Sequence, residues 1–302
     1  MPLHQLSKLG LGTAQWGMRY GSFNRSGQPE RIAIASMLRI ASMHHIRLID
    51  TAFLYGNAEE ILGECLQDDV AFDIVCKTPF FEPSLAPGES VDVLRRSFEL
   101  SLQRLNRKSL YGLLFHRASD LLSVSGEKLF EALEELRADG KVRKIGVSVY
   151  NKDEIESITS RFSVDLIQIP INVLDQRLLK SGVLGRLKQK GIEIHARSAF
   201  LQGLLLQSPE KLPAFFKPAQ DLLAAFHETA RKNQMSPLRA ALEFLMQLSE
   251  IDKVIVGVET EDQLREILVS FKDNVLPVNF SKFACCNESI LDPNCWPKME
   301  GV

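Results

Sequence analysis

Short apolar segments alternate with longer amphipathic segments along most of the chain, and this alternation constrains the fold more than any other feature. The short segments are apolar and β-rich, as buried strands of a parallel sheet are. They predict eight strands, at Lys8–Gly12, Arg47–Asp50, Phe72–Lys77, Tyr111–His116, Lys144–Ser148, Leu166–Ile169, Glu193–Arg197 and Lys253–Gly257. The segments between them carry apolar residues at helical spacing and predict helices at Pro29–His44, Ser90–Leu105, Glu127–Ala138, Lys152–Ser160 and Leu178–Lys190.

Eight strand–helix units favour an α/β fold of the (β/α)8 TIM-barrel type, because closure buries both faces of every parallel strand. The alternative is an open doubly wound sheet, but no G-x-G-x-x-G motif follows the first strand. We expect a single domain over residues 1–302 with an irregular tail over 273–302, which could reach over the open end of the barrel. Two stretches depart from the alternation: a long apolar segment at Phe200–Pro218, and an extra helix with Ser236 as cap and Pro237 in its first turn.

Charge and hydropathy narrow the class of protein. The formal net charge is -2 and both signs are mixed along the chain, so we expect no nucleic-acid partner. No apolar run approaches the roughly 20 residues of a membrane span, and the first residues lack the apolar core of a signal peptide. We therefore expect a cytoplasmic protein without a membrane partner. The five cysteines have no metal-ligand spacing, so no metal site is predicted.

Four side chains able to do chemistry stand at the ends of successive predicted strands. The second strand ends in Asp50, and Tyr55 follows in the loop before a helix that Asn57 could cap. The third strand ends in Lys77 and the fourth in His116. Because the carboxyl ends of barrel strands meet at one face, we expect these groups to share a pocket.

Together these four side chains could protonate an oxyanion while a hydride arrives at the attached carbon. An ammonium beside a phenol should lower the pKa of Tyr55 and make it a better general acid near neutral pH. Asp50 can neutralise Lys77, and His116 can donate a hydrogen bond to a carbonyl oxygen. We therefore expect Asp50, Tyr55, Lys77 and His116 to be catalytic.

The motifs around these residues are similar to those of the aldo-keto reductase superfamily, in its bacterial branch. They run in family order from residue 8 to about 270, as GLGTAQWG (10–17), DTAFLYGNAEEILGE (50–64), CKT (76–78), LLFHR (113–117), GKVRKIGVSVYN (140–151), DLIQIPINVLDQR (165–177) and VIVGVETEDQL (254–264). The resemblance implies a (β/α)8 barrel and reversible, nicotinamide-dependent carbonyl reduction. It also implies the same tetrad, with Tyr55 as acid, Lys77 and Asp50 tuning it, and His116 orienting the carbonyl group.

The resemblance also suggests how the cofactor is held. Ser148 and Gln168 match the positions that bind the nicotinamide carboxamide, while Val149 stands where the family has Asn. Asn172 or Asn151 could replace that lost hydrogen bond. The expected cofactor-binding residues are Gly12, Thr13, Asp50, Ser148, Gln168, Arg197, Ser198, Gly203, Gly257 and Gln263.

Arg197 occupies the position where a Tyr often stacks on the nicotinamide. A planar guanidinium can stack on a ring, and its charge would favour the neutral reduced cofactor over the oxidised cation. Gln263 stands where an Arg is common in NADPH-dependent members, and carboxylates crowd its loop, with Arg265 as the nearby cation. The family precedent favours NADPH and the local charge favours NADH; we predict NADPH, with NADH not excluded.

The substrate is expected to be an aldehyde or ketone, and the opening motif favours a sugar-like carbonyl compound. Trp16, Tyr55 and His116 are the expected substrate residues, although Trp16 could instead fill the barrel mouth. Two alternatives differ in class: a cofactor-binding regulatory subunit with little turnover, and a lyase that uses Lys77 as a Schiff-base amine. The paired Asp50 argues against the lyase. The sequence sets no oligomeric state.

Overall fold

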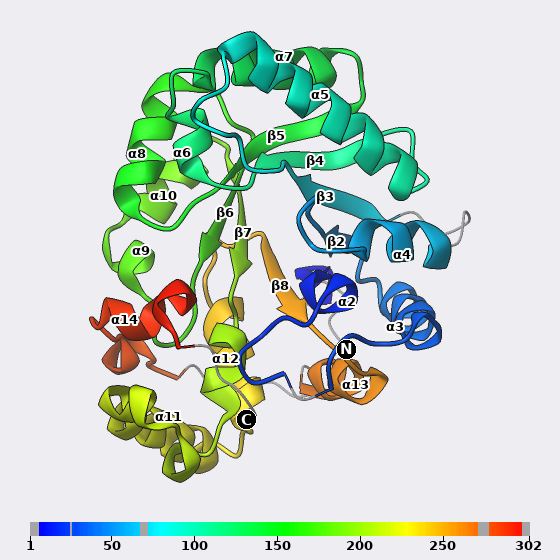
Figure 1. The fold of residues 1–302 in the computed structure, drawn as a ribbon. Helices are drawn as coiled ribbons and strands as arrows, with labels where there is room; N and C mark the ends of the chain where they lie inside the picture. Colours follow the sequence, from blue (N-terminus) through cyan, green and yellow to red (C-terminus); the bar gives the residue numbers. More distant parts are fainter. Residues whose placement is uncertain (1–5, 25, 67–71, 271–277, 298–302) are drawn as a thin grey trace.

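The computed structural model describes residues 6–24, 26–66, 72–270 and 278–297. Eight parallel strands form a closed barrel (Figure 1), in which each strand pairs with the next and β8 pairs with β1. The strands are β1 Leu9–Gly12, β2 Leu48–Asp50, β3 Asp73–Lys77, β4 Leu110–Phe115, β5 Val142–Ser148, β6 Leu166–Pro170, β7 Glu193–Arg197 and β8 Lys253–Gly257. The predicted TIM barrel is confirmed, and the alternative of an open sheet is excluded by the β1–β8 pairing.

Helices follow the strands and surround the barrel. The α-helices are α2 Ala14–Gly17, α3 Arg31–Met43, α4 Ala58–Cys65, α5 Pro87–Arg104, α6 Ala118–Leu121, α7 Gly126–Ala138, α8 Lys152–Arg161, α9 Arg177–Lys180, α10 Val183–Gln189, α11 Gln220–Lys232, α12 Pro237–Met246, α13 Glu261–Ser270 and α14 Glu288–Leu291. The 3-10 helices are η1 Leu201–Leu206, η2 Pro209–Lys211, η3 Ala214–Ala219, η4 Ser281–Phe283 and η5 Pro293–Cys295. Within the described ranges, no helix combines the length and apolarity that a membrane span requires.

Two local predictions about helices are wrong. The single helix expected over Leu178–Lys190 is divided into α9 and α10, because Gly182 adopts a φ of 70° that a continuing helix cannot contain. Asn57 precedes α4 but does not cap it with its side chain, because its Oδ1 accepts a hydrogen bond from Gln28 instead. The predicted cap of α12 is confirmed, since Ser236 accepts from the backbone N–H of Arg239 at 3.2 Å.

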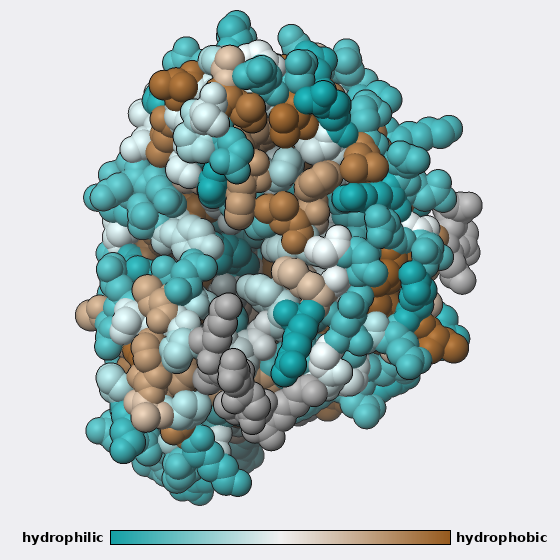
Figure 2. All heavy atoms as spheres, in the orientation of Figure 1, coloured by the Kyte–Doolittle hydropathy of each residue, from teal (hydrophilic) through white to brown (hydrophobic). Residues whose placement is uncertain are grey.

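Apolar side chains form two cores. A small cluster fills the barrel interior with one residue from each of five strands: Leu48, Val75, Leu114, Leu166 and Ile255. A much larger cluster lies between the barrel and the helices. Because both faces of each strand are covered, the strands read as apolar runs with polar residues mainly at their ends. Figure 2 shows that hydrophilic side chains predominate over the outer helices on the face in view, and that the surface is hollowed near its centre.

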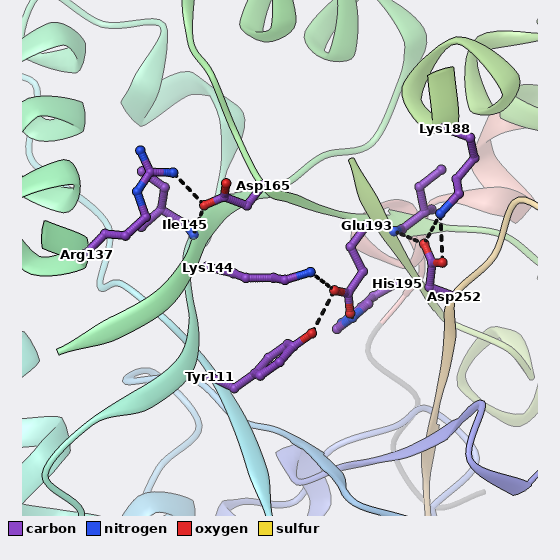
Figure 3. Close-up of polar contacts among 10 residues, drawn as sticks. Tyr111, Arg137, Lys144, Ile145, Asp165, Lys188, Glu193, His195 and Asp252 are labelled. Atoms are coloured by element: carbon purple, nitrogen blue, oxygen red, sulfur yellow. Dashed lines mark hydrogen bonds and ion pairs between the residues drawn. The ribbon is translucent and has the colours of Figure 1, made fainter. Parts of the chain in front are cut away.

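The amino end of the barrel is closed by a polar network (Figure 3). Glu193 accepts hydrogen bonds from Tyr111, Lys144 and His195. Burial opposes ionisation of this carboxyl group, but the bonds from His195 and Lys144 hold the pKa of Glu193 at about 2. His195 is fully buried here. Asp252 similarly joins Lys188 to the backbone of β7. In a TIM barrel this end supplies stability, whereas the carboxyl ends of the strands carry the site.

The described part of the tail, residues 278–297, lies at the carboxyl end of the barrel, as expected. The backbone N–H of Cys285 donates to Leu174 in the loop after β6 at 2.8 Å. The ring of Trp296 lies 4.7 Å from Phe216 and 6.4 Å from Phe23, centroid to centroid. The tail thereby joins the loops that follow β1 and β7. The part of the predicted tail at 273–277 and 298–302 lies outside the described residues.

Candidate active site

The four expected catalytic residues line one cavity of about 620 Å³ at the carboxyl end of the barrel. Asp50 and Lys77 are the last residues of β2 and β3, and His116 directly follows β4. Tyr55 comes from the loop between β2 and α4. The same cavity is lined by all the expected cofactor residues: Gly12, Thr13, Asp50, Ser148, Gln168, Arg197, Ser198, Gly203, Gly257 and Gln263. Strand ends as far apart in sequence as Gly12 and Gly257 thus meet at one site, as the barrel geometry dictates.

Two glycines set the position of Tyr55. The loop that carries it lies directly against α2, and a Cβ on Gly17 would lie 1.8 Å from the carbonyl oxygen of Tyr55. Gly56 has a φ of 56°, and a Cβ there would lie 2.1 Å from the oxygen of Gly17. Only glycine permits this approach of the two backbones. The Tyr-Gly pair therefore has a structural reason: it brings the phenol inward to the cavity.

Lys77 and Asp50 form a buried ion pair. The ammonium nitrogen lies 2.8 and 2.6 Å from the two carboxylate oxygens of Asp50 and 3.2 Å from the carbonyl oxygen of Thr51. Gln168 reaches the same carboxylate with its Nε2, 2.7 Å from Oδ1 of Asp50. Three oxygens thus surround the ammonium. This geometry opposes the lyase alternative, which needs a free Lys77 amine.

The prediction that Lys77 lowers the pKa of Tyr55 is wrong in this structure. Burial raises the pKa of the Tyr55 phenol, and the Asp50 carboxylate raises it further. The Lys77 nitrogen lies 5.2 Å from the centroid of the Tyr55 ring, but its charge is compensated by Asp50. Tyr55 therefore stays protonated throughout the neutral pH range.

His116 is neutral at neutral pH. Burial lowers the pKa of its imidazole to about 3, and the nearby cations Lys77 and Arg197 contribute. Its ring lies edge-on to Tyr55 at 5.7 Å and 5.2 Å from Phe80, centroid to centroid. A neutral imidazole keeps one N–H, so His116 can donate one hydrogen bond to an oxygen placed between it and Tyr55.

The lining of the cavity suits a nicotinamide dinucleotide. Gln168 Oε1 and Thr13 Oγ1 are buried and have no hydrogen-bond partner among the described residues. Buried polar atoms rarely stay unpaired, so they are available to the polar groups of a ligand. Gly203 and Gly257 line the cavity too, and a Cβ on Gly257 would lie 2.4 Å from the Gln15 side chain. Glycine at 257 thus lets the Gln15 side chain, which also lines the cavity, lie against the backbone at the end of β8.

Neither expected replacement for the missing family Asn is free to hold the carboxamide. Val149 is fully buried in the core. Asn172 donates to the carbonyl oxygen of Ser198 and accepts from two backbone N–H groups in its own loop. Asn151 caps α8 by accepting from Glu154 at 2.9 Å. Both Asn side chains are therefore engaged in holding loops, and these two predictions are wrong.

Trp16 does not line the cavity. Its ring is fully buried, and its Nε1 donates to the carbonyl oxygen of Val258 at 2.8 Å. The bond ties α2 to the loop after β8. Of the two expectations for Trp16, packing at the barrel mouth is therefore supported and lining of the substrate pocket is not.

Several lining residues were not among the predicted site residues. They include Tyr20, Phe80, Tyr150, Gln202 and Glu259. Tyr150 follows β5 by two residues and Phe80 follows β3 by three, so the rule that strand ends build the site could have identified both. Gln202 and Glu259 lie in the loops after β7 and β8, where chain direction cannot be read from the sequence.

Comparisons with known proteins agree with this geometry. The Aldo/keto reductase family model matches residues 8–284. A 6-dehydroglucose reductase of Novosphingobium aromaticivorans is 30% identical, with 70% of this chain and 71% of that protein covered. An NADH-specific methylglyoxal reductase of Escherichia coli is 24% identical, with 89% and 91% covered. A holo aldo-keto reductase structure from Bacillus halodurans superposes with a TM-score of 0.74 at 20% identity, covering 93% of each chain.

Members of the matched family are oxidoreductases that act on small carbonyl compounds with a nicotinamide cofactor. The family model covers nearly the whole barrel, including the strands that carry the tetrad. The chain therefore belongs to the aldo-keto reductase family.

Proposed function

We propose that this protein reduces a small aldehyde or ketone to an alcohol, with Tyr55 as the proton donor. The observation that carries the proposal is the convergence of Tyr55, His116 and the Lys77–Asp50 pair on one cavity. A bound nicotinamide cofactor would supply the hydride. The residues of the chain position the carbonyl group and provide the proton.

His116 and Tyr55 have complementary tasks. The neutral imidazole of His116 donates a hydrogen bond that orients the carbonyl oxygen without protonating it. As hydride reaches the carbon, negative charge develops on that oxygen, which becomes an alkoxide. An alkoxide is a stronger base than a phenolate, so the Tyr55 proton moves to it even though burial raises the phenol pKa.

The Lys77 ammonium attracts the phenolate that remains, against the opposing field of Asp50. The ammonium is held 5.2 Å from the centroid of the Tyr55 ring by its bonds to Asp50 and Thr51. As negative charge appears on the phenol, the attraction to Lys77 grows while the geometry stays fixed. Preorganised charge of this kind costs no rearrangement during the reaction.

The proposed cofactor is NADH, in place of the NADPH that family precedent suggested. Glu259 and Glu266 line the cavity beside the loop after β8. Arg265, the expected nearby cation, does not line it and approaches Glu261 at 3.6 Å. Carboxylates repel a ribose 2′-phosphate and accept a hydrogen bond from a ribose 2′-hydroxyl. The name of the NADH-specific relative supports the same choice.

The proposed substrate is a short oxygen-rich carbonyl compound, including sugar-like ones. The names of three relatives support this class: a methylglyoxal reductase, an L-glyceraldehyde 3-phosphate reductase and a 6-dehydroglucose reductase. A panel of methylglyoxal, glyceraldehyde and aldoses, assayed with NADH and NADPH, tests substrate and cofactor together.

The proposal for Tyr55 is tested with Tyr55→Phe. This variant should lose at least a hundredfold in kcat, because the general acid is removed. The Kd for NADH, measured by fluorescence titration, should remain within about threefold of the wild-type value. Retained binding would show that the variant is folded. Turnover in Tyr55→Phe close to that of the wild type would exclude the phenol as proton donor.

A further inference from the structure

Arg197 brings an uncompensated positive charge to the wall of the cavity. Lys77, the other cation there, is paired with Asp50 at 2.6 Å. Arg197 forms no ion pair with any carboxylate in the described ranges. Its guanidinium donates only to the carbonyl oxygen of Val149 at 3.3 Å and to Oγ of Ser198 at 3.4 Å. The Lys77–Asp50 pair has no net charge and His116 is neutral, so Arg197 carries the net charge among these groups. The carboxylates of Glu259 and Glu266 line the β8 side of the same cavity.

Tyr150 holds that charge in place. The guanidinium carbon of Arg197 lies 4.3 Å from the centroid of the Tyr150 ring, which is a close cation–π contact. Tyr150 also lines the cavity and is 39% exposed. A planar guanidinium stacked on a ring loses much of the freedom of a long side chain. The stack therefore fixes the charge at the cavity wall.

The same charge is close to the reacting atoms. Burial dominates the pKa shifts of Tyr55 and His116, and the field of Arg197 contributes to both, lowering each pKa. These two groups must contact the carbonyl oxygen of a substrate. The hydride donor must approach the carbonyl carbon to within about 3.5 Å. A nicotinamide ring in this cavity therefore lies in the field of Arg197.

We propose that Arg197, held on Tyr150, makes the site discriminate between the two redox states of the nicotinamide, binding the reduced form and repelling the oxidised form. This inference rests on the proposed function. The reduced ring is neutral, and loss of hydride leaves it with one positive charge. The guanidinium opposes that charge, so the oxidised dinucleotide binds more weakly.

The discrimination favours product release. The repulsion also opposes the charge that develops during hydride transfer, so it does not accelerate the chemical step. Its benefit comes afterwards, because the oxidised cofactor leaves more easily. Where cofactor release limits turnover, this sustains carbonyl reduction and reduces inhibition by the oxidised product.

The experiment measures Kd for NADH by fluorescence and for NAD+ by calorimetry, in the wild type and in Arg197→Gln. The quantity compared is the ratio of Kd for NAD+ to Kd for NADH. We expect this ratio to be at least ten in the wild type and to fall about tenfold in Arg197→Gln. Arg197→Lys, which keeps the charge, should retain a larger ratio than Arg197→Gln. Tyr150→Leu, which keeps the guanidinium and loses the stack, should give an intermediate ratio.

Arg117 provides the matched control. Its guanidinium also stacks on an aromatic ring, 4.5 Å from the Phe80 centroid, but it is paired with Asp120 at 2.8 Å and does not line the cavity. Arg117→Gln should leave the ratio unchanged.

A ratio in Arg197→Gln equal to that of the wild type, or an equal loss of affinity for both forms, overturns the inference. So does a raised KM for the carbonyl substrate with an unchanged ratio, because the charge then serves the substrate. A wild type that binds neither dinucleotide overturns the proposed function itself.

Discussion

Lys77 donates to both carboxylate oxygens of Asp50, at 2.8 and 2.6 Å, in a pair whose side chains are 1% and 6% exposed. Each charge is buried only because the other is present. Gln168 and Thr51 supply further bonds to the pair. In the proposed mechanism the same arrangement serves catalysis by holding an ammonium beside Tyr55. It also serves stability, because it fills the mouth of the barrel without an unpaired charge.

Removal of one partner should therefore be costly. Lys77→Met leaves the Asp50 carboxylate buried and unpaired, and we expect a loss of about 3–5 kcal/mol in the free energy of unfolding. The double variant Lys77→Met with Asp50→Asn should recover part of that loss. Urea denaturation at pH 7 provides the measurement. The exposed pair Lys128–Glu131 serves as control, and Lys128→Met should stay within about 0.5 kcal/mol of the wild type. Equal losses in Lys77→Met and the double variant would contradict the coupling.

His116 should make stability depend on pH. Its folded-state pKa of about 3 lies below the ordinary value of 6.5. Below pH 6.5 the unfolded chain binds a proton that the folded chain excludes, so this contribution is complete above pH 6.5 and declines as the pH falls toward 3. His116→Gln cannot take up that proton. Urea midpoints at pH 7.5 and 5.0 should thus fall less in His116→Gln than in the wild type. Parallel changes in the two proteins would show that His116 does not cause the dependence.

The barrel and three of the four expected catalytic residues could be predicted from strand ends, whereas Tyr55, in the loop after β2, is recognisable only with the family motif around it. Apolar runs that end in Asp50, Lys77 and just before His116 locate the elements, and closure brings the ends together. Strand periodicity and position are local properties of the chain. The observed strand bounds therefore differ from the predicted ones by at most two residues.

The errors arose where a side chain has a choice of partners. Asn57 could cap α4 but bonds to Gln28, and Asn172 could face a cofactor but holds its own loop. The pKa of Tyr55 is raised by burial and by the Asp50 carboxylate, and neither effect can be read from the position of Lys77 in the sequence. Trp16 could point inward or outward from α2. Such choices are made by tertiary packing, which a single sequence does not specify.

The cofactor preference should respond to the charge beside the loop after β8. Gln263 accepts from the backbone N–H of Glu259 with its Oε1, at 2.8 Å, and so holds that carboxylate at the cavity. The double variant Glu259→Gln with Gln263→Arg removes a negative charge and adds a positive one, which favours a 2′-phosphate. We expect the ratio of kcat/KM for NADPH over NADH to rise at least tenfold. Arg265→Gln is the control and should leave the ratio unchanged, because Arg265 lies outside the lining. An unchanged ratio in the double variant would show that the 2′-position of the cofactor ribose does not lie beside Glu259 and Gln263.

Gln202 joins the loops after β1 and β7 across the cavity. Its Oε1 accepts from both the N–H and the hydroxyl of Ser22, at 3.0 and 2.9 Å. Its own backbone is in the left-handed region, with a φ of 50°, and its neighbour Leu201 has a φ of 47°. Backbone of this kind costs about 1–3 kcal/mol per residue and persists only where surrounding contacts hold it.

Loss of this link should loosen the site. Gln202→Ala removes both bonds and should raise the dissociation rate of NADH several-fold in stopped-flow fluorescence. Amide hydrogen exchange in residues 198–207 should also become faster. Ser22→Ala keeps the backbone bond, so its effect should be smaller. Gln234→Ala is the matched control, since Gln234 has a φ of 56° but lies in the exposed turn between α11 and α12. If Gln202→Ala and Gln234→Ala give the same dissociation rate as the wild type, the link does not retain the cofactor.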